Sequence, residues 1–211
     1  MKNANQNNFR IGRVGSAVVV IALGSLPLSG IAKDKEPSPA EKAAESTTAA
    51  PAKVEEAKKT PLKVGNFTFQ LSPPWTDKKQ TRPMVKAVVA WTDPAKTHKP
   101  LDATFYHFGP GQGGSVGANV SRWEGQFRGK VDKNAEELNL KNGKVTIVHL
   151  KGTYMDGPMF GDKTPKDGHA MLGAIFEDAK GGHVFIKLTG PGAAVEASKK
   201  AFYKLASSPL E

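Results

Sequence analysis

The chain contains no cysteine. A disulfide framework, a thiolate metal site and a cysteine nucleophile are therefore excluded. A lipid anchor of the bacterial type is excluded as well, because its attachment requires a cysteine at the cleavage site. An exported domain without disulfides must instead be held together by its hydrophobic core.

Long apolar runs are also scarce, and the longest is the 15-residue run from Val14 to Leu28. It is shorter than the roughly 20 residues that span a bilayer. Three basic residues precede it and two small residues follow it: Lys2, Arg10, Arg13, Gly30 and Ala32. This order predicts a signal peptide over residues 1–32, a secreted or periplasmic protein, and no stable membrane span after cleavage. An uncleaved membrane anchor or a buried helix is the alternative.

Aromatic residues are absent from residues 33–61, where six lysines balance six acidic residues. Such a segment cannot bury enough apolar surface to offset its chain entropy, so we predict a disordered linker. The net charge of +10 then lies mainly on the folded domain, predicted over residues 62–211. A basic domain favours an anionic polymer or an unknown envelope protein as partner, although a solvated lysine surface is the simpler alternative. Because arginine is rare and dispersed, nucleic acid is not expected.

Six segments of the domain have the apolar pattern of strands: 66–71, 83–91, 101–108, 144–150, 169–176 and 183–188. One helix is predicted to start after the N-cap residue Ser115 and to end at Gly129, with Trp123 buried on its apolar stripe. A second helix is predicted from Pro191 to Ala206. The order of these elements predicts an α+β fold, with two helices packed on a mostly antiparallel six-stranded sheet.

Two runs of the sequence resemble known families. The closing run FIKLTGPGAAVEASKKAFYKLASS resembles the end of PsbP-like domains, the fold shared by PsbP and the Mog family, and this resemblance implies a PsbP-like fold for the domain. The run GPGQGGSVGANVSRWEGQF, together with FIKLTGP, is similar to a family of uncharacterised bacterial secreted proteins. Neither resemblance implies an activity or a catalytic residue, because one fold can host unrelated functions.

The motifs of common catalytic and cofactor sites are missing. The run GPGQGGS has neither the Gly-Lys-Ser/Thr ending of a phosphate-binding loop nor the spacing of a dinucleotide fingerprint. The five histidines form no pair at helical i, i+4 spacing and no His-x-His, so we expect no metal site. Ser115 is better explained as a helix cap than as a nucleophile. We therefore predict no catalytic residue and no cofactor.

A shallow ligand site is predicted at one edge of the sheet. If the helix after residue 108 crosses over to a parallel strand, then three strands end at the same edge. Their exits are GPGQGG, GTYMDGPM and TGPG, and both helices begin there with their positive dipole ends. The candidate residues for binding an anionic or polar group are Gly113, Gly114, Ser115, Asn119, Arg122 and Tyr154. The alternative is that the glycines only let the helices pack close to the sheet.

The long loop expected at residues 152–168 is either an apolar contact for a partner or a segment folded back on the core. Together these patterns predict an exported, non-enzymatic binding or assembly module. The alternative is an enzyme or small-ligand carrier that uses the glycine-rich edge. A cluster of buried titratable groups around Ser115 and Arg122 would favour that alternative.

Overall fold

The computed structural model describes residues 58–80, 82–158 and 160–211, which belong to one compact unit. The predicted signal peptide and residues 33–57 of the predicted linker lie outside the described residues. The first strand begins at Thr60, so the last two residues of the predicted linker already belong to the folded domain. Strand β1 (Thr60–Val64) pairs with β2 (Phe67–Leu71) in a separate antiparallel hairpin.

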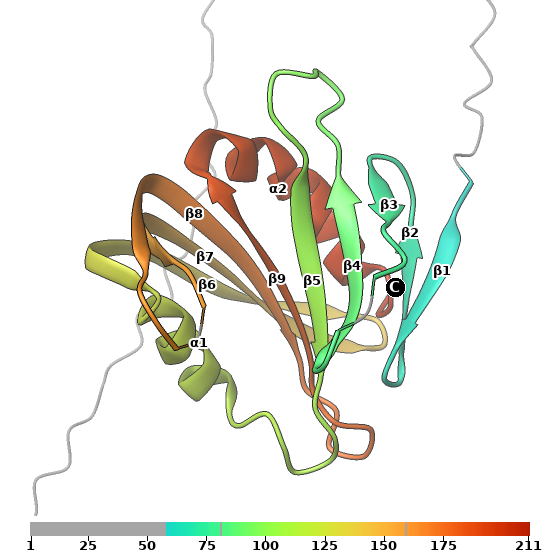
Figure 1. Cartoon of the computed structure of the whole chain (residues 1–211). Coiled ribbons are helices and arrows are strands. Elements are labelled where there is room, and N and C mark those ends of the chain that lie inside the picture. Colours follow the sequence, from blue (N-terminus) through green and yellow to red (C-terminus); the bar gives the residue numbers. More distant parts are fainter. Residues whose placement is uncertain (1–57, 81, 159) are drawn as a thin grey trace, which may run out of the picture. The chain divides into compact units, whose positions relative to one another are not determined.

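The main sheet has seven strands in the order β3-β4-β5-β9-β8-β7-β6 (Figure 1), and every neighbouring pair is antiparallel. Its strands are β3 (Trp75–Asp77), β4 (Val85–Trp91), β5 (Leu101–His107), β6 (Phe127–Leu140), β7 (Gly143–Asp156), β8 (Thr164–Phe176) and β9 (Val184–Pro191). The two helices are α1 (Val116–Glu124) and α2 (Gly192–Ser207). This arrangement confirms the predicted α+β class with two helices and a mostly antiparallel sheet.

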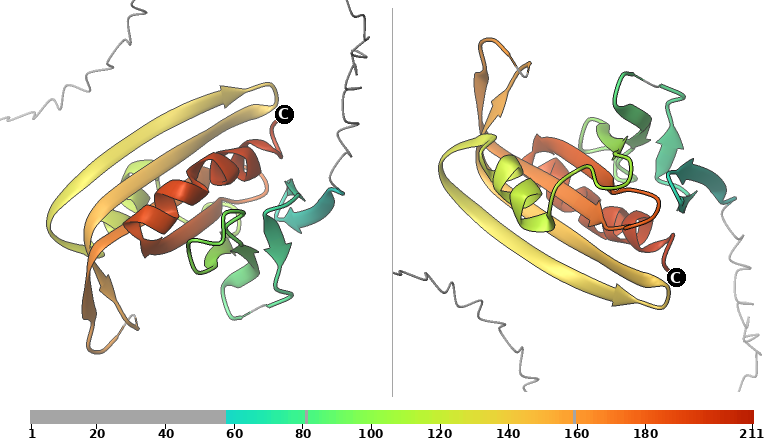
Figure 2. Two further views of the ribbon diagram at one scale, coloured as in Figure 1. Left: turned by 90° about the horizontal axis from the view of Figure 1, so that it is seen from above. Right: turned by 90° about the horizontal axis from the view of Figure 1, so that it is seen from below.

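Alternate side chains of each strand point to opposite faces of the sheet, so the sheet has two faces that can be buried. The two helices pack on opposite faces. On the α2 face, Val195, Phe202 and Leu205 join a buried cluster that includes Ile147 and Leu172. The β1–β2 hairpin packs into the same cluster. Seen from above and from below, α2 and α1 cover different sides of the strands (Figure 2).

The α1 face has a smaller core that is built around Trp123. This indole is 6% exposed, which confirms its predicted burial, and it packs with Phe127, Met171 and Phe185. Its ring lies directly over Gly173, where an added Cβ would come within 2.1 Å of it. The absence of a side chain at residue 173 therefore lets α1 approach β8 closely.

Helix α1 begins where the sequence predicted, and α2 begins at Gly192, one residue after its predicted start. The Ser115 hydroxyl accepts a hydrogen bond from the Ala118 amide at 3.2 Å, so Ser115 is the N-cap of α1. However, α1 ends at Glu124, one residue before its C-cap Gly125. Gly129, the predicted helix end, has φ +74° inside the bulged start of β6.

Three strands were missed, and the longest of them changes the topology. The first helix was predicted to end at Gly129 and no strand was predicted between residues 129 and 144, but residues 127–140 form the 14-residue edge strand β6. The predicted loop over residues 152–168 is mostly the paired ends of β7 and β8. The strand at residues 66–71 was correctly found but belongs to the hairpin, not to the main sheet.

The predicted meeting of three strand ends at one edge is wrong. Strand β5 is antiparallel to β9, while β7 runs in the same direction as β9 because both are antiparallel to β8. The exit of β5 therefore lies at the opposite end of the sheet from the exits of β7 and β9. The crossover through α1 does connect two strands of the same direction, but these are β5 and the missed strand β6.

Candidate functional site

The structure brings five of the six predicted site residues together, and they bind one another. The Asn119 amide donates to the carbonyls of Gly113 at 2.7 Å and Ser115 at 2.9 Å. Arg122 Nη1 donates to Asn119 Oδ1 at 2.8 Å. Gly113 and Gly114 have φ of +95° and +73°, a conformation that favours glycine. This network fixes the loop onto α1.

The sixth predicted residue, Tyr154, lies elsewhere on the α1 face. Its ring packs against Phe127 with the ring centroids 5.3 Å apart. Its hydroxyl accepts a hydrogen bond from Lys187 Nζ at 3.1 Å, and Lys187 also donates to Gln126. Tyr154 thus joins the start of β6 to β7 and β9. Because the three strand exits do not meet at one edge of the sheet, they do not form the predicted ligand site. Ligand binding by the glycine-rich loop stays a prediction.

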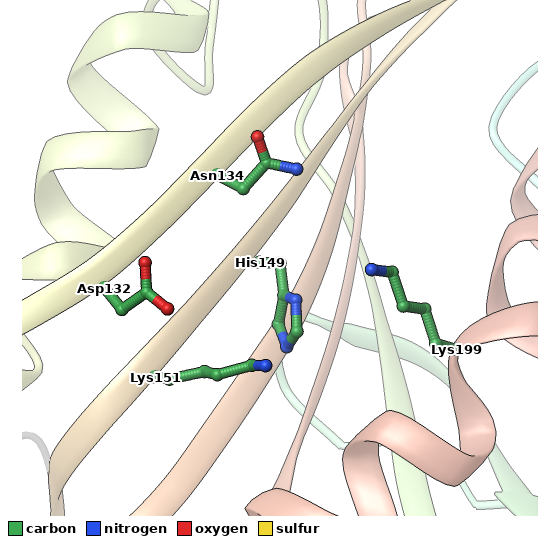
Figure 3. Close-up of a pocket in the computed structure, with 5 residues that line it drawn as sticks. All are labelled: Asp132, Asn134, His149, Lys151 and Lys199. Atoms are coloured by element: carbon green, nitrogen blue, oxygen red, sulfur yellow. The ribbon is translucent and has the colours of Figure 1, made fainter. Parts of the chain in front are cut away.

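A different group of polar residues gathers on the α2 face, between α2 and the strands β6 and β7. Along β7, Val145 and Ile147 point into the core under α2, and the next residues on that face are His149 and Lys151. Across from them on β6 lie Asn134, opposite His149, and Asp132, opposite Lys151. We call the space between these strands and α2 the α2 groove (Figure 3).

One wall of the α2 groove comes from a single face of α2. Glu196, Lys199, Lys200 and Tyr203 stand at positions i, i+3, i+4 and i+7, which are neighbours on a helix surface. They line a shallow depression of about 460 Å³. Lys199 also lines a second, smaller depression beside it of about 170 Å³. The other residues that line this smaller depression are Asp132, Asn134, His149 and Lys151.

His149 has a polar atom that the fold does not satisfy. The side chain is only 6% exposed, and its Nε2 atom is buried without a hydrogen-bond partner among the described residues. The closest acidic group is Glu196, whose Oε2 lies 3.9 Å away, too far for a hydrogen bond. Buried polar atoms in native proteins are normally paired, and an unpaired one costs about 1–3 kcal/mol. Nε2 is therefore a candidate to bond with a ligand.

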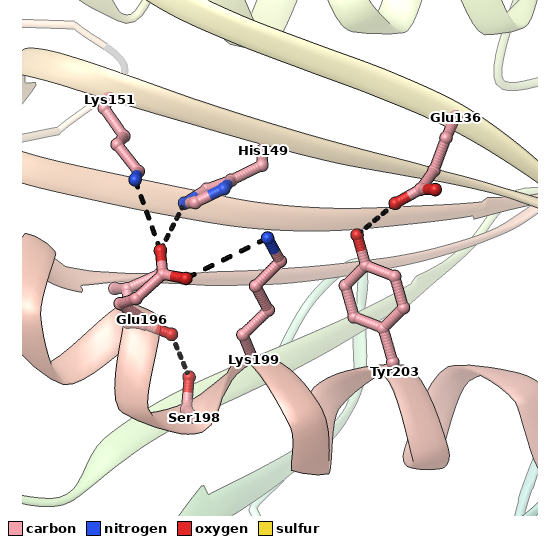
Figure 4. Close-up of polar contacts among 8 residues, drawn as sticks. Glu136, His149, Lys151, Glu196, Ser198, Lys199 and Tyr203 are labelled. Atoms are coloured by element: carbon pink, nitrogen blue, oxygen red, sulfur yellow. Dashed lines mark hydrogen bonds and ion pairs between the residues drawn. The ribbon is translucent and has the colours of Figure 1, made fainter. Parts of the chain in front are cut away.

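Positive and negative side chains are balanced around His149. The Glu196 carboxylate lies 3.2 Å from Lys151 Nζ and 3.9 Å from Lys199 Nζ (Figure 4). The hydrogen bond from Lys151 lowers the pKa of Glu196. Burial lowers the pKa of His149, and the charges of Lys151 and Lys199 lower it further. His149 is therefore a neutral imidazole at neutral pH.

Tyr203 is held at the far end of the groove. Its hydroxyl donates a hydrogen bond to the carboxylate of Glu136 on β6, and burial together with this carboxylate raises the pKa of the phenol. Lys199 Nζ lies 6.0 Å from the centre of its ring. The aromatic ring is thus fixed in place with an ammonium group beside it.

Sequence reasoning did not find the α2 groove. No strand was predicted over its β6 residues, and His149 was considered only as one of five histidines without metal-binding spacing. One signal was available, because the alternation of KVTIVHL places His149 on the same face as Val145 and Ile147. A histidine at a core-facing strand position is a buried titratable group, and such groups cluster at functional sites.

Comparison with known proteins gives a likeness in fold. The chain is similar to the solution structure of cyanobacterial PsbP (CyanoP) from Synechocystis sp. PCC 6803, with 14% sequence identity and a TM-score of 0.45. The match covers 76% of this chain and 96% of that chain. No protein-family model matches the chain, and no curated protein matches its sequence. The likeness concerns the arrangement of helices and strands and says nothing about a site or an activity.

Two further features bear on the kind of site. Within the described ranges, no group of three or more histidine, aspartate and glutamate residues is placed to hold a metal ion. In the same part of the chain, neither helix is long and apolar enough to cross a membrane. The α2 groove is lined by lysines, carboxylates, an amide, a neutral imidazole and a phenol ring. These are groups that recognise a ligand by hydrogen bonds and charge.

Proposed function

We propose that this protein is an exported, non-enzymatic binding module that holds an anionic, hydrogen-bonding group of its ligand in the α2 groove. The observation that carries this proposal is the buried, unpaired Nε2 atom of His149, a residue that lines the 170 Å³ depression. A bound ligand would supply the missing hydrogen bond, and the neighbouring Lys151 and Lys199 would supply the attraction for its negative charge.

The chemistry of the groove favours binding over catalysis. The hydroxyl of Ser198, on the adjacent turn of α2, is buried and donates to the Val195 carbonyl at 2.8 Å (Figure 4). It is therefore directed into the helix and is no nucleophile for the groove. His149 forms no hydrogen bond with Glu196 that would orient it as a general base. Lysines, an imidazole and carboxylates arranged in this way fit recognition.

The cellular setting is proposed from the sequence. The signal peptide predicted over residues 1–32 and the similarity of the GPGQGGSVGANVSRWEGQF run to secreted bacterial proteins support export. Among the partner classes, an anionic polymer fits the groove better than an envelope protein. The two depressions are small, and Lys151, Lys199 and Lys200 line them. The alternative function at the glycine-rich edge has weaker support, because Asn119 and Arg122 bind the loop and each other.

Nuclear magnetic resonance (NMR) of the full chain tests this function. We expect millimolar acetate, the minimal carboxylate, to shift the imidazole signals of His149 and the amide signals of Lys151 and Lys199. Lysine 180, exposed in the turn between β8 and β9, provides the matched control and should not respond. If acetate shifts none of these signals, or shifts Lys180 as much as Lys151, the proposed function is wrong.

A further inference from the structure

The smaller depression of the α2 groove contains acceptors as well as donors of hydrogen bonds. The Asp132 carboxylate only accepts, the Lys199 ammonium only donates, and the Asn134 amide does both. His149 Nε2 accepts or donates according to which ring nitrogen carries the proton. A hydroxyl group can pair with every one of these partners and with either tautomer of His149, whereas a carboxylate can only accept.

The charges around the depression disfavour a bare inorganic anion. A phosphate or sulfate that reached Lys151 and Lys199 would also lie beside the carboxylates of Asp132 and Glu196, which line the same groove. Like charges at such short range repel each other strongly. A ligand with one negative charge and several hydroxyls lessens this conflict, because it brings less negative charge next to Glu196, which already contacts Lys151 and Lys199, and its hydroxyls can face the carboxylates.

The larger depression adds a flat surface next to this polar pocket. Tyr203 lines it together with Lys199 and Lys200, and the hydrogen bond from Tyr203 to Glu136 fixes the ring. Aromatic rings commonly form the wall of small-molecule sites, where they contact the apolar parts of a ligand. The C–H face of a sugar ring is such a part. Lys199 lines both depressions, so it stands where a ring-bound carboxylate would meet the polar pocket.

We propose that the ligand of the α2 groove is an acidic sugar, such as a uronic acid unit of an anionic polysaccharide. The sugar ring lies against Tyr203, its carboxylate meets Lys199 and Lys151, and its hydroxyls bind His149, Asp132 and Asn134. This inference rests on the proposed function and names the class of ligand for the same groove.

Calorimetric titration of the full chain with three probes separates the two proposals. Glucuronate carries the charge, the ring and the hydroxyls, glucose lacks the charge, and acetate lacks the ring. We expect glucuronate to bind at least about tenfold more tightly than either control, a difference of about 1.4 kcal/mol. If acetate binds as tightly as glucuronate, the sugar inference is overturned and the proposed function stands. Equal binding of glucose overturns the requirement for an acid, and no binding of any probe overturns both proposals.

Variants of α2 test the assigned contacts. Tyr203→Ala should weaken glucuronate binding about tenfold, whereas Tyr203→Phe, which keeps the ring and loses only the hydrogen bond to Glu136, should weaken it less. Lys199→Met should weaken glucuronate and acetate alike, and Lys180→Met should weaken neither. Equal effects of Tyr203→Ala on glucuronate and on acetate would contradict the assigned role of the ring. Circular dichroism of each variant establishes that it is folded.

Discussion

At the scale of single residues, one buried polar side-chain atom in the described part of the chain lacks a hydrogen-bond partner. His149 stands on the buried face of β7, two residues after Ile147, and its Nε2 atom has no partner among the described residues. An apolar side chain would be stable at this place. Natural proteins accept such a loss of stability mainly where a function requires it.

Replacing His149 should therefore separate stability from binding. We expect His149→Phe to raise the free energy of unfolding by about 1–3 kcal/mol, because it removes a buried unpaired polar atom, and to abolish ligand binding. Urea denaturation measures the first effect and calorimetry the second. The matched control is His107→Phe, which should bring no such gain because His107 Nε2 is bonded to the Gly181 carbonyl at 2.8 Å. A loss of stability in His149→Phe would show that the imidazole is structural.

The lowered pKa of His149 predicts that the stability of the protein depends on pH. Burial lowers the pKa of His149 in the folded protein, so the unfolded chain binds its proton first as the pH falls. Stability is then lost as the pH falls below about 6.5, the ordinary value for histidine. The pKa of Glu196, lowered mainly by Lys151, extends this loss to still lower pH. We expect the fall in stability between about pH 7.5 and pH 5.5 to be smaller in His149→Gln than in wild type, and equal slopes would contradict this.

Close packing at Gly173 gives a third expectation. A Cβ at residue 173 would lie 2.1 Å from the Trp123 ring, so Gly173→Ala should destabilise the protein by about 1–3 kcal/mol through overpacking. Gly117 of α1 has open space around it, and Gly117→Ala should instead stabilise the helix by about 0.5–1 kcal/mol. Thermal denaturation of both variants measures the contrast. Similar shifts in both would mean that α1 does not lie tightly over β8.

At the scale of elements, the sequence predicts well wherever a segment buries one regular apolar face. Both helices and the six apolar strands were found for this reason, with α2 in error by one residue at each end. Strand β6 was missed because it is an edge strand with charged residues on both faces, and most of its side chains are exposed. Charged edge strands resist unwanted pairing, but they carry no apolar alternation. Without β6, both the direction of β5 relative to β7 and the α2 groove were out of reach.

Three elements on the α1 face are joined by one amine. Lys187 of β9 contacts Tyr154 of β7 and Gln126, which precedes β6. Burial lowers the pKa of Lys187 to about 8, with Lys163 lowering it further and Asp156 opposing.

The unfolded chain therefore holds this proton more tightly than the folded one, and the contribution of Lys187 to stability increases as the pH rises above about 8. Urea denaturation between about pH 7.5 and pH 9.5 should show a smaller increase in Lys187→Met than in wild type. An increase of the same size in both would contradict the low pKa.

At the scale of the whole molecule, the antiparallel sheet separates two faces whose polar groups are arranged differently. The α1 face carries the glycine-rich loop, whose polar groups bind one another. The α2 face carries the groove with the unpaired imidazole. The two helices begin at opposite ends of the sheet, so their positive dipole ends cannot act on one ligand. The central claim is therefore that a ligand binds on the α2 face.

The most direct test of that claim is the NMR spectrum of the histidine rings during a titration with glucuronate. We predict that the ring signals of His149 shift and saturate, because the ligand supplies the partner that Nε2 lacks. The rings of His169 and His183, which lie outside the groove, should stay unchanged. A titration that leaves the His149 ring unchanged and shifts the amides of Gly113, Gly114 and Ser115 would contradict the claim and return the site to the α1 face.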